Sequence, residues 1–499
     1  MFGKRHKARY CEIHKRNNII IIQEPLAHII NLSLTEAVFP TELKCATITP
    51  VFKNGDPCLL GNYRPISILP LYSKIYERVV YNRIYNYLIN NNLLYLHQYG
   101  FRKNHSTASA LATLIDQISL ALDGKKSVLG VYLDLSKAFD TVSHRILLSK
   151  LEKYGIRGTS LLWVRSFLSN RQQIVKWNNA LSQPELVECG VPQGSILGPL
   201  LFLLYINDLH AVSDKLFFLM YADDTNIFAV SDDPSELETS VNEEMTKVEI
   251  WLKANELSLN IAKTHAMIFS NTSNVLNYPF NVTLNGTSIR FVDRTKFLGV
   301  IVDSKLSWSH HIDYIHGKIS KGIGILKKVR KILNKKTMVN LYYTFLYPYL
   351  SYCNIIWGRA SKKYINRLLL LQKRAIRIVC NSAFRAHSEP LFKECNILTI
   401  YNINIYLVGI FMFQYYHNLL PKANLELFMS RRDIHQRNTR NSSRVILQLP
   451  LCRTELRKRT LCYDGSYLWN NTIIPNSHHL KIENSMFIFK RNLKIMLIN

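Results

Sequence analysis

Hydrophobic positions follow two different spacings in the first 300 residues, and together they predict a mixed α+β fold. Apolar residues recur at helical spacing over 72–89 and 106–122, where Ser106 is placed to cap the helix N-terminus. The run 128–133 is apolar throughout but too short for a helix, which indicates a buried strand. A strand is also expected over 41–53, where β-branched residues are frequent.

A tight β-hairpin is expected where the strand-like runs 215–221 and 225–230 meet across Ala222-Asp223-Asp224. Further helices are expected at 25–40, 143–154, 159–168, 196–209 and 234–255, and further strands at 171–177, 185–189, 258–260, 265–270 and 289–302, the last as a pair around Arg294. Beyond residue 305 the spacing becomes mostly helical, over 310–334, 336–347, 361–381 and 400–418. The chain is therefore expected to pass from an α+β region into a helical one.

Charge is distributed unevenly along the chain, which carries 63 Lys and Arg against 35 Asp and Glu. Residues 1–300 hold 31 basic and 26 acidic side chains, whereas 301–499 hold 32 and 9. This asymmetry favours a long polyanionic partner bound by the second half; a solvated basic surface without a partner is the alternative. Residues 201–250 reverse the trend with 2 basic and 11 acidic side chains, which indicates a local acidic centre.

Cysteine spacing and hydropathy exclude several classes of protein. None of the nine cysteines forms a C-x-x-C pair, so zinc ribbons and knuckles are unsupported and free thiols in a reducing compartment are expected. No apolar run approaches the roughly 18 residues of a transmembrane helix. Residues 1–16 are basic, as a nuclear-import patch or simply a frayed terminus would be. We therefore expect a nuclear or cytoplasmic protein, neither secreted nor membrane-bound.

Three carboxylates lie at predicted strand ends: Asp134 after 128–133, and Asp223 with Asp224 in the hairpin turn. Strands of one sheet bring such ends together, and carboxylates that repel each other are commonly relieved by a hard divalent cation such as Mg²⁺. Two such ions could activate a hydroxyl and stabilise a leaving pyrophosphate. Taken singly, an Asp-Asp turn is ordinary turn chemistry, and Asp134 could instead cap a following helix.

Ordered motifs around these carboxylates resemble those of reverse transcriptases. The strings are LDLSKAFD (133–140), GVPQGS (190–195), YADD (221–224) and FLG (297–299), preceded by PVFKNGD (50–56), NYRPIS (62–67) and QYGFR (98–102). The upstream strings are similar to those of the non-LTR, LINE-type branch, near jockey-like elements. One string alone is weak, but several in a fixed order over about 41–302 make a specific match.

This resemblance implies a role for each matching residue. Asp134, Asp223 and Asp224 would bind two Mg²⁺ ions, with Mn²⁺ as an alternative, and the Leu135 carbonyl would be a further ligand. The incoming nucleotide would be bound by Lys53, Arg64, Phe139, Gln193 and Lys263, with Phe139 excluding a ribose 2′-hydroxyl. Phe297, Leu298 and Gly299 would form the primer grip. Plainer alternatives are a core aromatic for Phe139, a solvated strand-end lysine for Lys263 and a structural role for Asp140.

The resemblance also implies a right-hand polymerase fold. We expect a basic segment and helix at 1–40, fingers and an antiparallel-sheet palm at 41–302, a helical thumb at 303–395 and a basic, mostly helical region at 396–499. The partners would be an RNA template, a DNA primer or nicked target DNA, and dNTPs. Tyr342, Tyr343, Tyr347, Tyr349 and Trp357 could stack on nucleic acid, but core packing is favoured for them.

Some features of related elements have no counterpart in the sequence. About 40 residues precede the first motif, so no endonuclease is expected, and the sparse acidic residues beyond 303 predict no ribonuclease H. The favoured function is therefore an RNA-directed DNA polymerase of a non-LTR retrotransposon. The alternatives are an inactive, truncated remnant that only binds nucleic acid and an intron-maturase-like protein. The 467–470 string, which resembles the C-terminal region of jockey-like proteins, disfavours the latter.

Overall fold

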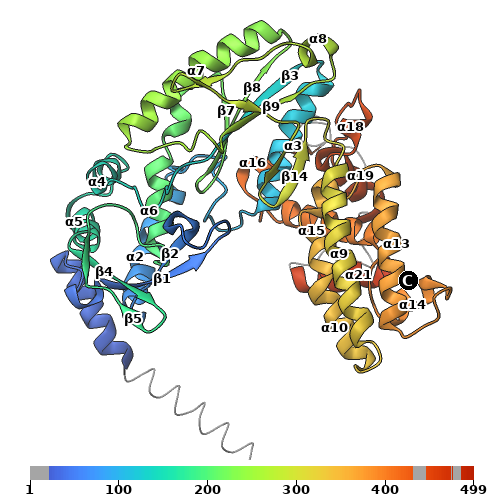
Figure 1. Cartoon of the computed structure of the whole chain (residues 1–499), viewed down its shortest axis with the longest axis horizontal. Helices are drawn as coiled ribbons and strands as arrows, with labels where there is room; N and C mark the ends of the chain where they lie inside the picture. The colour runs from blue at the N-terminus through green and yellow to red at the C-terminus, as the bar shows by residue number, and fades with distance from the viewer. Residues whose placement is uncertain (1–21, 431–445, 474, 476–484, 499) are drawn as a thin grey trace, which may run out of the picture. The chain divides into compact units, whose positions relative to one another are not determined.

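The computed structural model describes residues 22–430, 446–473, 475 and 485–498, which fall into two units (Figure 1). Unit 1 contains the described residues of Met1–Tyr95, Leu135–Val212 and Lys247–Asn260. Unit 2 contains those of Leu96–Asp134, Ser213–Thr246 and Ile261–Asn499. The basic residues at 1–16 lie outside the described part of the chain, as do Arg437, Arg440 and Arg444 of the region 396–499 that is expected to be basic.

Unit 1 is built on a sheet with the strand order β2-β1-β4-β5, in which β6 also pairs with β4. Its strands are β1 (Cys45–Phe52), β2 (Tyr63–Ile68), β4 (Arg171–Trp177), β5 (Ala180–Leu181) and β6 (Glu185–Val187). Its helices are 22–36, α2 (Leu71–Asn90), α4 (His144–Lys153), α5 (Gly158–Leu168) and α6 (Leu197–Ile206), with 3-10 turns η1 (Thr41–Leu43), η2 (Leu60–Asn62) and η3 (Leu209–Val212). Helix α6 is buried from Leu197 to Ile206 except at Pro199, so its apolar run is part of the core.

Unit 2 contains a second sheet with the order β12-β9-β3-β8-β7. These strands are β3 (Ser127–Leu133), β7 (Phe217–Tyr221), β8 (Asp224–Ser231), β9 (His265–Phe269) and β12 (Arg290–Phe291). Strand β3 is central, antiparallel to both β8 and β9, and buried along its whole length. Helix α3 (Thr107–Asp123) packs on the sheet and begins at Ser106, whose hydroxyl accepts from Ser109 N in a capping box.

Two hairpins and two helices accompany this sheet. The hairpins pair β10 (Thr283–Leu284) with β11 (Thr287–Ser288) and β13 (Arg294–Phe297) with β14 (Val300–Asp303); the helices are α7 (Pro234–Ala254), which continues into unit 1, and α8 (Ser273–Leu276). The later part of unit 2 is helical: α9 (Ser309–Val329), α10 (Lys335–Phe345), α11 (Tyr347–Ser351), α12 (Asn354–Trp357), α13 (Lys362–Val379), α14 (Ser388–Glu394), α15 (Ile400–Tyr416), α16 (Lys422–Leu425), α18 (Glu455–Lys458), α19 (Leu461–Leu468), a π-helical turn η4 (Trp469–Ile473) and α21 (Met486–Ile498).

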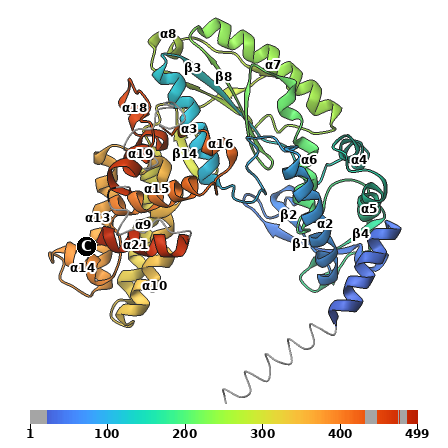
Figure 2. The same ribbon diagram turned by 180° about the vertical axis from the view of Figure 1, so that it is seen from behind.

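One hydrophobic core connects the sheet of unit 2 to its helices. It includes residues of α3, β3, α9 and α13 and extends to Phe489 and Leu493 of α21. Helix α15 packs against both α19 and α21 (Figures 1 and 2). The residues beyond 396 therefore share a core with the helices before them, and the boundary expected at 395 stays a prediction. None of the described helices combines the length and apolar character needed to cross a membrane.

The α+β class is confirmed, and so are most of the long elements. Two expectations are wrong. Residues 258–260 make only an isolated bridge between Leu259 and Leu135. The strand pair expected around Arg294 turns instead at Leu298 and Gly299, because Gly299 readily adopts its φ of +81° while Arg294 already pairs with Asp303. Several short helices were also missed, including α11, where Pro348 occupies the first turn rather than ending a helix.

Candidate active site

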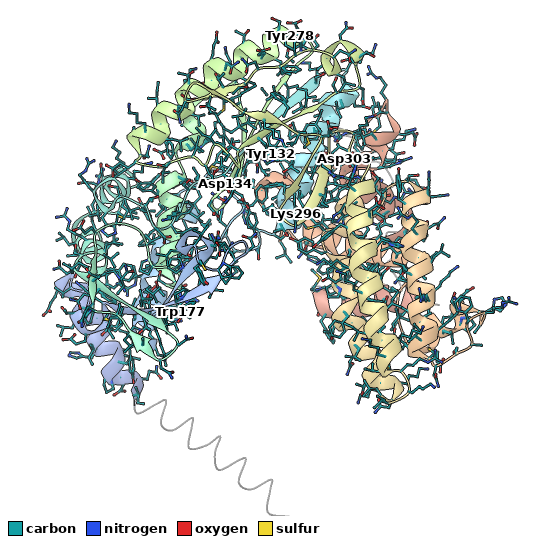
Figure 3. The ribbon with its side chains drawn as sticks, in the orientation of Figure 1. Tyr132, Asp134, Trp177, Tyr278, Lys296 and Asp303 are labelled. Carbon is teal, nitrogen blue, oxygen red and sulfur yellow. The ribbon has the colours of Figure 1, made fainter. Side chains whose placement is uncertain are left out.

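Three carboxylates come together at the strand ends on one side of the unit 2 sheet, where β3 ends and the β7–β8 turn lies. The antiparallel register of β3 and β8 ends with the pair Leu133 and Thr225, so Asp134 and Asp224 occupy the next positions along the two strands. Asp224 also closes the β7–β8 hairpin opposite Tyr221, which leaves Ala222 and Asp223 as its two-residue loop. Asp134 lies just beyond Tyr132 at the end of β3 (Figure 3). The expected hairpin and convergence of strand ends are therefore confirmed.

Burial and the two neighbouring carboxylates oppose the ionisation of Asp224. Removal of water from the Asp224 carboxyl by the surrounding protein, followed by the charges of Asp223 and Asp134, raises the pKa of Asp224 to about 6. Asp223 and Asp224 nevertheless remain exposed, so a ligand from solvent can reach them. Oxygen donors with mutual repulsion suit a hard divalent cation. Among the described residues, however, no three His, Cys, Asp or Glu side chains are grouped closely enough to hold a metal ion as they stand.

Lys263 lies beside the first of these carboxylates. Its Nζ is 3.7 Å from Asp134 Oδ2, and its side chain is 70% exposed. The next residue, Thr264, is buried and accepts a hydrogen bond from Asp134 N at 3.3 Å. An exposed ion pair contributes little stability, so Lys263 remains available for a ligand. Leu135 is buried and held by its bridge to Leu259; its role as a carbonyl ligand stays a prediction.

The β13–β14 hairpin carries the residues expected to form a primer grip. Phe297 is buried, while Leu298 and Gly299 form the turn with φ of +45° and +81°. Tyr352 Oη donates to Leu298 O at 2.8 Å. A Cβ at position 299 would lie 3.0 Å from the Tyr352 ring. No motif had marked Tyr352, although it fixes the conformation of this turn.

Two further candidates, Lys53 and Arg64, lie on the β1–β2 hairpin of unit 1. Strand β1 ends with Phe52 opposite Tyr63, so Lys53 and Arg64 stand next to this last pair, on opposite strands. Lys53 N donates to Asn62 O at 2.8 Å, which orders the start of the loop. Both side chains are exposed. A point charge and a bidentate guanidinium at one hairpin end suit a phosphate group.

Gln193 and Asp140 form a second polar cluster in unit 1. Gln193 Nε2 donates to Asp140 Oδ1 at 2.8 Å, and Ser67 N of β2 donates to Gln193 O at 2.7 Å. Burial raises the pKa of Asp140, although the Gln193 hydrogen bond and nearby lysines partly offset this. A Cβ at Gly194 would lie 2.3 Å from Ser67 O, so the loop can approach β2 only because residue 194 is glycine. Asp140 thus orients Gln193, in agreement with the structural role allowed for it.

Phe139 is half-buried and stacks on Phe202, with ring centroids 4.3 Å apart. This contact fixes the ring while leaving part of it accessible. Ser195 Oγ accepts from Gly198 N at 2.7 Å, so this side chain caps the first turn of α6. Sequence patterns did not identify Glu77, a fully buried carboxylate whose Oε2 accepts from Ile196 N and Leu197 N at the start of α6.

Most of the aromatic residues in the later helices are packing residues. Tyr342 and Trp357 are completely buried, and Tyr343, Tyr347 and Tyr349 pack against the same core, as favoured from the sequence. In the 467–470 string, Trp469 is buried, and Asn470 accepts from Leu447 N and donates to Leu447 O. The residues of this string therefore stabilise the C-terminal part of the fold through burial and backbone hydrogen bonds.

Comparison with known proteins identifies the class. The model of the family described as reverse transcriptase (RNA-dependent DNA polymerase) matches residues 51–302, about half of the chain, so the chain belongs to this family. The probable RNA-directed DNA polymerase from transposon BS of Drosophila melanogaster is 31% identical over 396 residues, which cover 75% of this chain and 42% of that protein. The RNA-directed DNA polymerase from mobile element jockey of the same species is 28% identical over 383 residues, covering 74% and 41%.

The chain thus spans about two-fifths of the length of these relatives. The expected resemblance to jockey-like non-LTR elements is confirmed. Among solved structures, apo telomerase from Candida tropicalis aligns with a TM-score of 0.42 and 12% identity, covering 80% of this chain and 71% of that one.

Proposed function

We propose that the chain catalyses RNA-templated DNA synthesis for a non-LTR retrotransposon, extending a DNA 3′ end with dNTPs. The observation that carries this proposal is the meeting of Asp134, Asp223 and Asp224 at one sheet edge, where the pKa of Asp224 is raised to about 6. A perturbed carboxylate cluster within the matched family region is a functional-site signature. The site would act in a nuclear or cytoplasmic ribonucleoprotein.

The three carboxylates and the Leu135 carbonyl would hold two Mg²⁺ ions, or Mn²⁺ in their place. Bound there, the ions would lower the pKa of the primer 3′-hydroxyl and neutralise charge on the departing pyrophosphate. The protein's contribution is to fix the carboxylates on the ends of β3, β7 and β8. The exposed Lys263 would leave Asp134 and pair with the triphosphate, a change that costs little because its ion pair is solvated.

Other residues of the matching motifs would bind the nucleotide. Lys53 and Arg64 would contact the triphosphate, and Gln193, oriented by Asp140, would contact the nucleotide or template base pair. Phe139 would lie beneath the sugar, held against Phe202. If Phe139→Val leaves the ratio of dNTP to rNTP incorporation unchanged, this steric role is excluded.

Phe297, Leu298 and Gly299 would support the primer end through their backbone. The exposed basic side chains of α9, among them Lys321, Lys327 and Lys328, would bind the phosphates of the template–primer duplex. Other basic side chains already form ion pairs within the protein: Lys335 with Glu394, and Arg367 with Asp313 at 2.6 Å.

Primer extension on poly(rA)–oligo(dT) tests the proposal against an inactive, RNA-binding remnant. The wild type should incorporate dTTP with Mg²⁺, whereas the Asp223→Ala, Asp224→Ala double variant should bind RNA but incorporate none. Asp232→Ala, an exposed aspartate of the same acidic segment, is the matched control and should retain wild-type activity. If wild type and double variant are equally inactive while both bind RNA, the remnant is the correct interpretation.

A further inference from the structure

Residues 97–100 form a short extended segment against the β7 edge of the unit 2 sheet. Met220 N donates to His97 O at 3.0 Å, and Tyr99 N donates to Met220 O at 2.8 Å. Gln98 and Met220 thus form a parallel bridge next to the carboxylate hairpin. The 98–102 string, which the proposed chemistry has not used, therefore belongs structurally to the β7–β8 hairpin.

The Gln98 side chain contacts the hairpin turn itself. Gln98 is fully buried, and its Oε1 accepts hydrogen bonds from Gly100 N at 2.9 Å and from Ala222 N at 3.2 Å. Because both partners are N–H donors, this end of the carboxamide must be the oxygen. Nε2 has no hydrogen-bond partner among the described residues. The side chain thus acts on the turn through its acceptor alone.

Ala222 is the residue in the turn that needs such support. Its φ of +57° lies in the left-handed region, which is unfavourable for a residue with a Cβ. Ala222 is buried, and Asp223 and Asp224 follow it directly. A change in the Ala222 backbone would therefore move both carboxylates relative to Asp134.

The segment is shaped to approach the turn closely and is anchored behind it. A Cβ at Gly100 would lie 2.2 Å from Ala222 N, so no larger residue fits there. Arg102 Nη1 donates to Gln98 O at 3.0 Å, and Tyr99 Oη shares a 2.6 Å hydrogen bond with Thr113 of α3. The segment that carries Gln98 is consequently attached to α3 through Tyr99, while the Gln98 side chain accepts a hydrogen bond from Ala222 N.

We propose that Gln98 is a positioning residue for DNA synthesis: its carboxamide oxygen fixes the Ala222 amide so that Asp223 and Asp224 face Asp134 together. The inference rests on the proposed function of these carboxylates. Gln98 contacts no reacting atom and acts through the turn. Its loss should therefore reduce the rate of the chemical step without weakening the binding of template–primer.

Two substitutions separate the acceptor from the bulk of the side chain. Gln98→Met removes the acceptor at similar length, whereas Gln98→Glu, which burial keeps protonated and neutral, retains an acceptor oxygen and replaces the unpartnered amino group with a hydroxyl. Because ångström-scale misplacement of reacting groups costs about 10²-fold in rate, Gln98→Met should lower kcat at least about tenfold. The KM for dTTP and the Kd for template–primer should stay within about threefold, and Gln98→Glu should recover most of kcat. Gln183→Met, in an exposed loop, is the matched control.

Hydrogen exchange measured by mass spectrometry on the metal-free protein gives a second readout. Gln98→Met should accelerate exchange in peptides containing residues 221–224 and leave the thermal midpoint nearly unchanged, because only the turn is released. Unchanged exchange and unchanged kcat would overturn the inference. So would faster exchange throughout unit 2 with a lower thermal midpoint, since Gln98 would then support the whole unit. A wild type that never extends primers would refute the proposed function, while exchange would still decide whether Gln98 holds the turn.

Discussion

Two sets of aspartates in unit 2 are treated in opposite ways by the protein around them. Asp134, Asp223 and Asp224 gather where strands β3 and β8 meet the β7–β8 turn, and there burial, followed by the charges of Asp223 and Asp134, raises the pKa of Asp224. Asp116 and Asp123 lie on α3, which packs on the same sheet, and protein donors surround their carboxylates. The first set is held in an arrangement that destabilises the charge of Asp224, and the second is held by hydrogen bonds and an ion pair to the C-terminal part of the chain.

The α3 aspartates bind the C-terminal part of the chain. Arg457 Nη1 donates to Asp116 Oδ1 at 2.6 Å, in a pair that is almost completely buried. Asp123 Oδ1 accepts from Thr454 N and Thr454 Oγ1, both at 2.7 Å, and from Arg453 N. Burial alone would raise the pKa of Asp123, but these hydrogen bonds outweigh it and lower the pKa. Burial still raises the pKa of Asp116, and the Arg457 charge and hydrogen bond offset only part of this effect. Asp116 therefore depends on a partner from the protein itself, whereas Asp224 lies where a ligand from solvent could relieve its charge.

The largest expected effect is on activity at the sheet edge. Asp134→Asn should reduce primer extension by about 10³-fold or more, because it removes a charge required only for the chemistry. Its thermal midpoint should not fall, since the like-charge repulsion also decreases. Asp123→Asn should do the reverse, lowering stability while folded protein retains its specific activity. Steady-state extension and thermal unfolding on both variants test this, and a fully active Asp134→Asn would remove Asp134 from the site.

The next effect is on stability at α3. Arg457→Met should lower the free energy of unfolding by about 3–5 kcal/mol, because Asp116 would remain buried without its partner. Urea denaturation followed by tryptophan fluorescence measures it, with exposed Lys458→Met as the control. Adding Asp116→Leu to Arg457→Met should recover most of the loss, as replacing both partners of a buried pair often does. A double variant no more stable than the single one would contradict this account.

These two sets also differ in how far the sequence could reveal them. Asp134, Asp223 and Asp224 follow from strand ends and a two-residue turn, which are local patterns, so their convergence was predictable. Arg457 and Asp116 are 341 positions apart, and nothing in the spacing around either marks the other. The structural roles of Gln98, Glu77 and Tyr352 were missed for the same reason. Each side chain forms a hydrogen bond with a backbone atom of a segment that is distant in sequence. The sequence therefore allowed the candidate metal-binding residues to be predicted, but not the contacts between distant segments that fix their positions.

The pH dependence of stability should have opposite signs for Asp224 and Asp123, whose pKa values are shifted in opposite directions. For Asp224 the folded pKa of about 6 lies above the ordinary 3.8, so the native state binds the proton more tightly. Wild-type stability should therefore decrease as pH rises from about 4 through 6, relative to Asp224→Asn. In metal-free buffer with a chelator, the thermal midpoint of the variant minus that of the wild type should grow over this interval and then level off. A constant difference would mean that the folded state does not raise the pKa of Asp224.

The smallest effect should come from Asp123, whose folded pKa lies below 3.8. Its contribution to stability is present above the ordinary pKa and is lost as pH falls through the folded value. The midpoint of the wild type minus that of Asp123→Asn should thus be largest near pH 6 and shrink below about pH 4. The remaining difference should be modest, because an asparagine oxygen still accepts from Thr454 N. If the difference instead grows on acidification, Asp123 repels its surroundings as Asp224 does, and the contrast between the two sets is wrong.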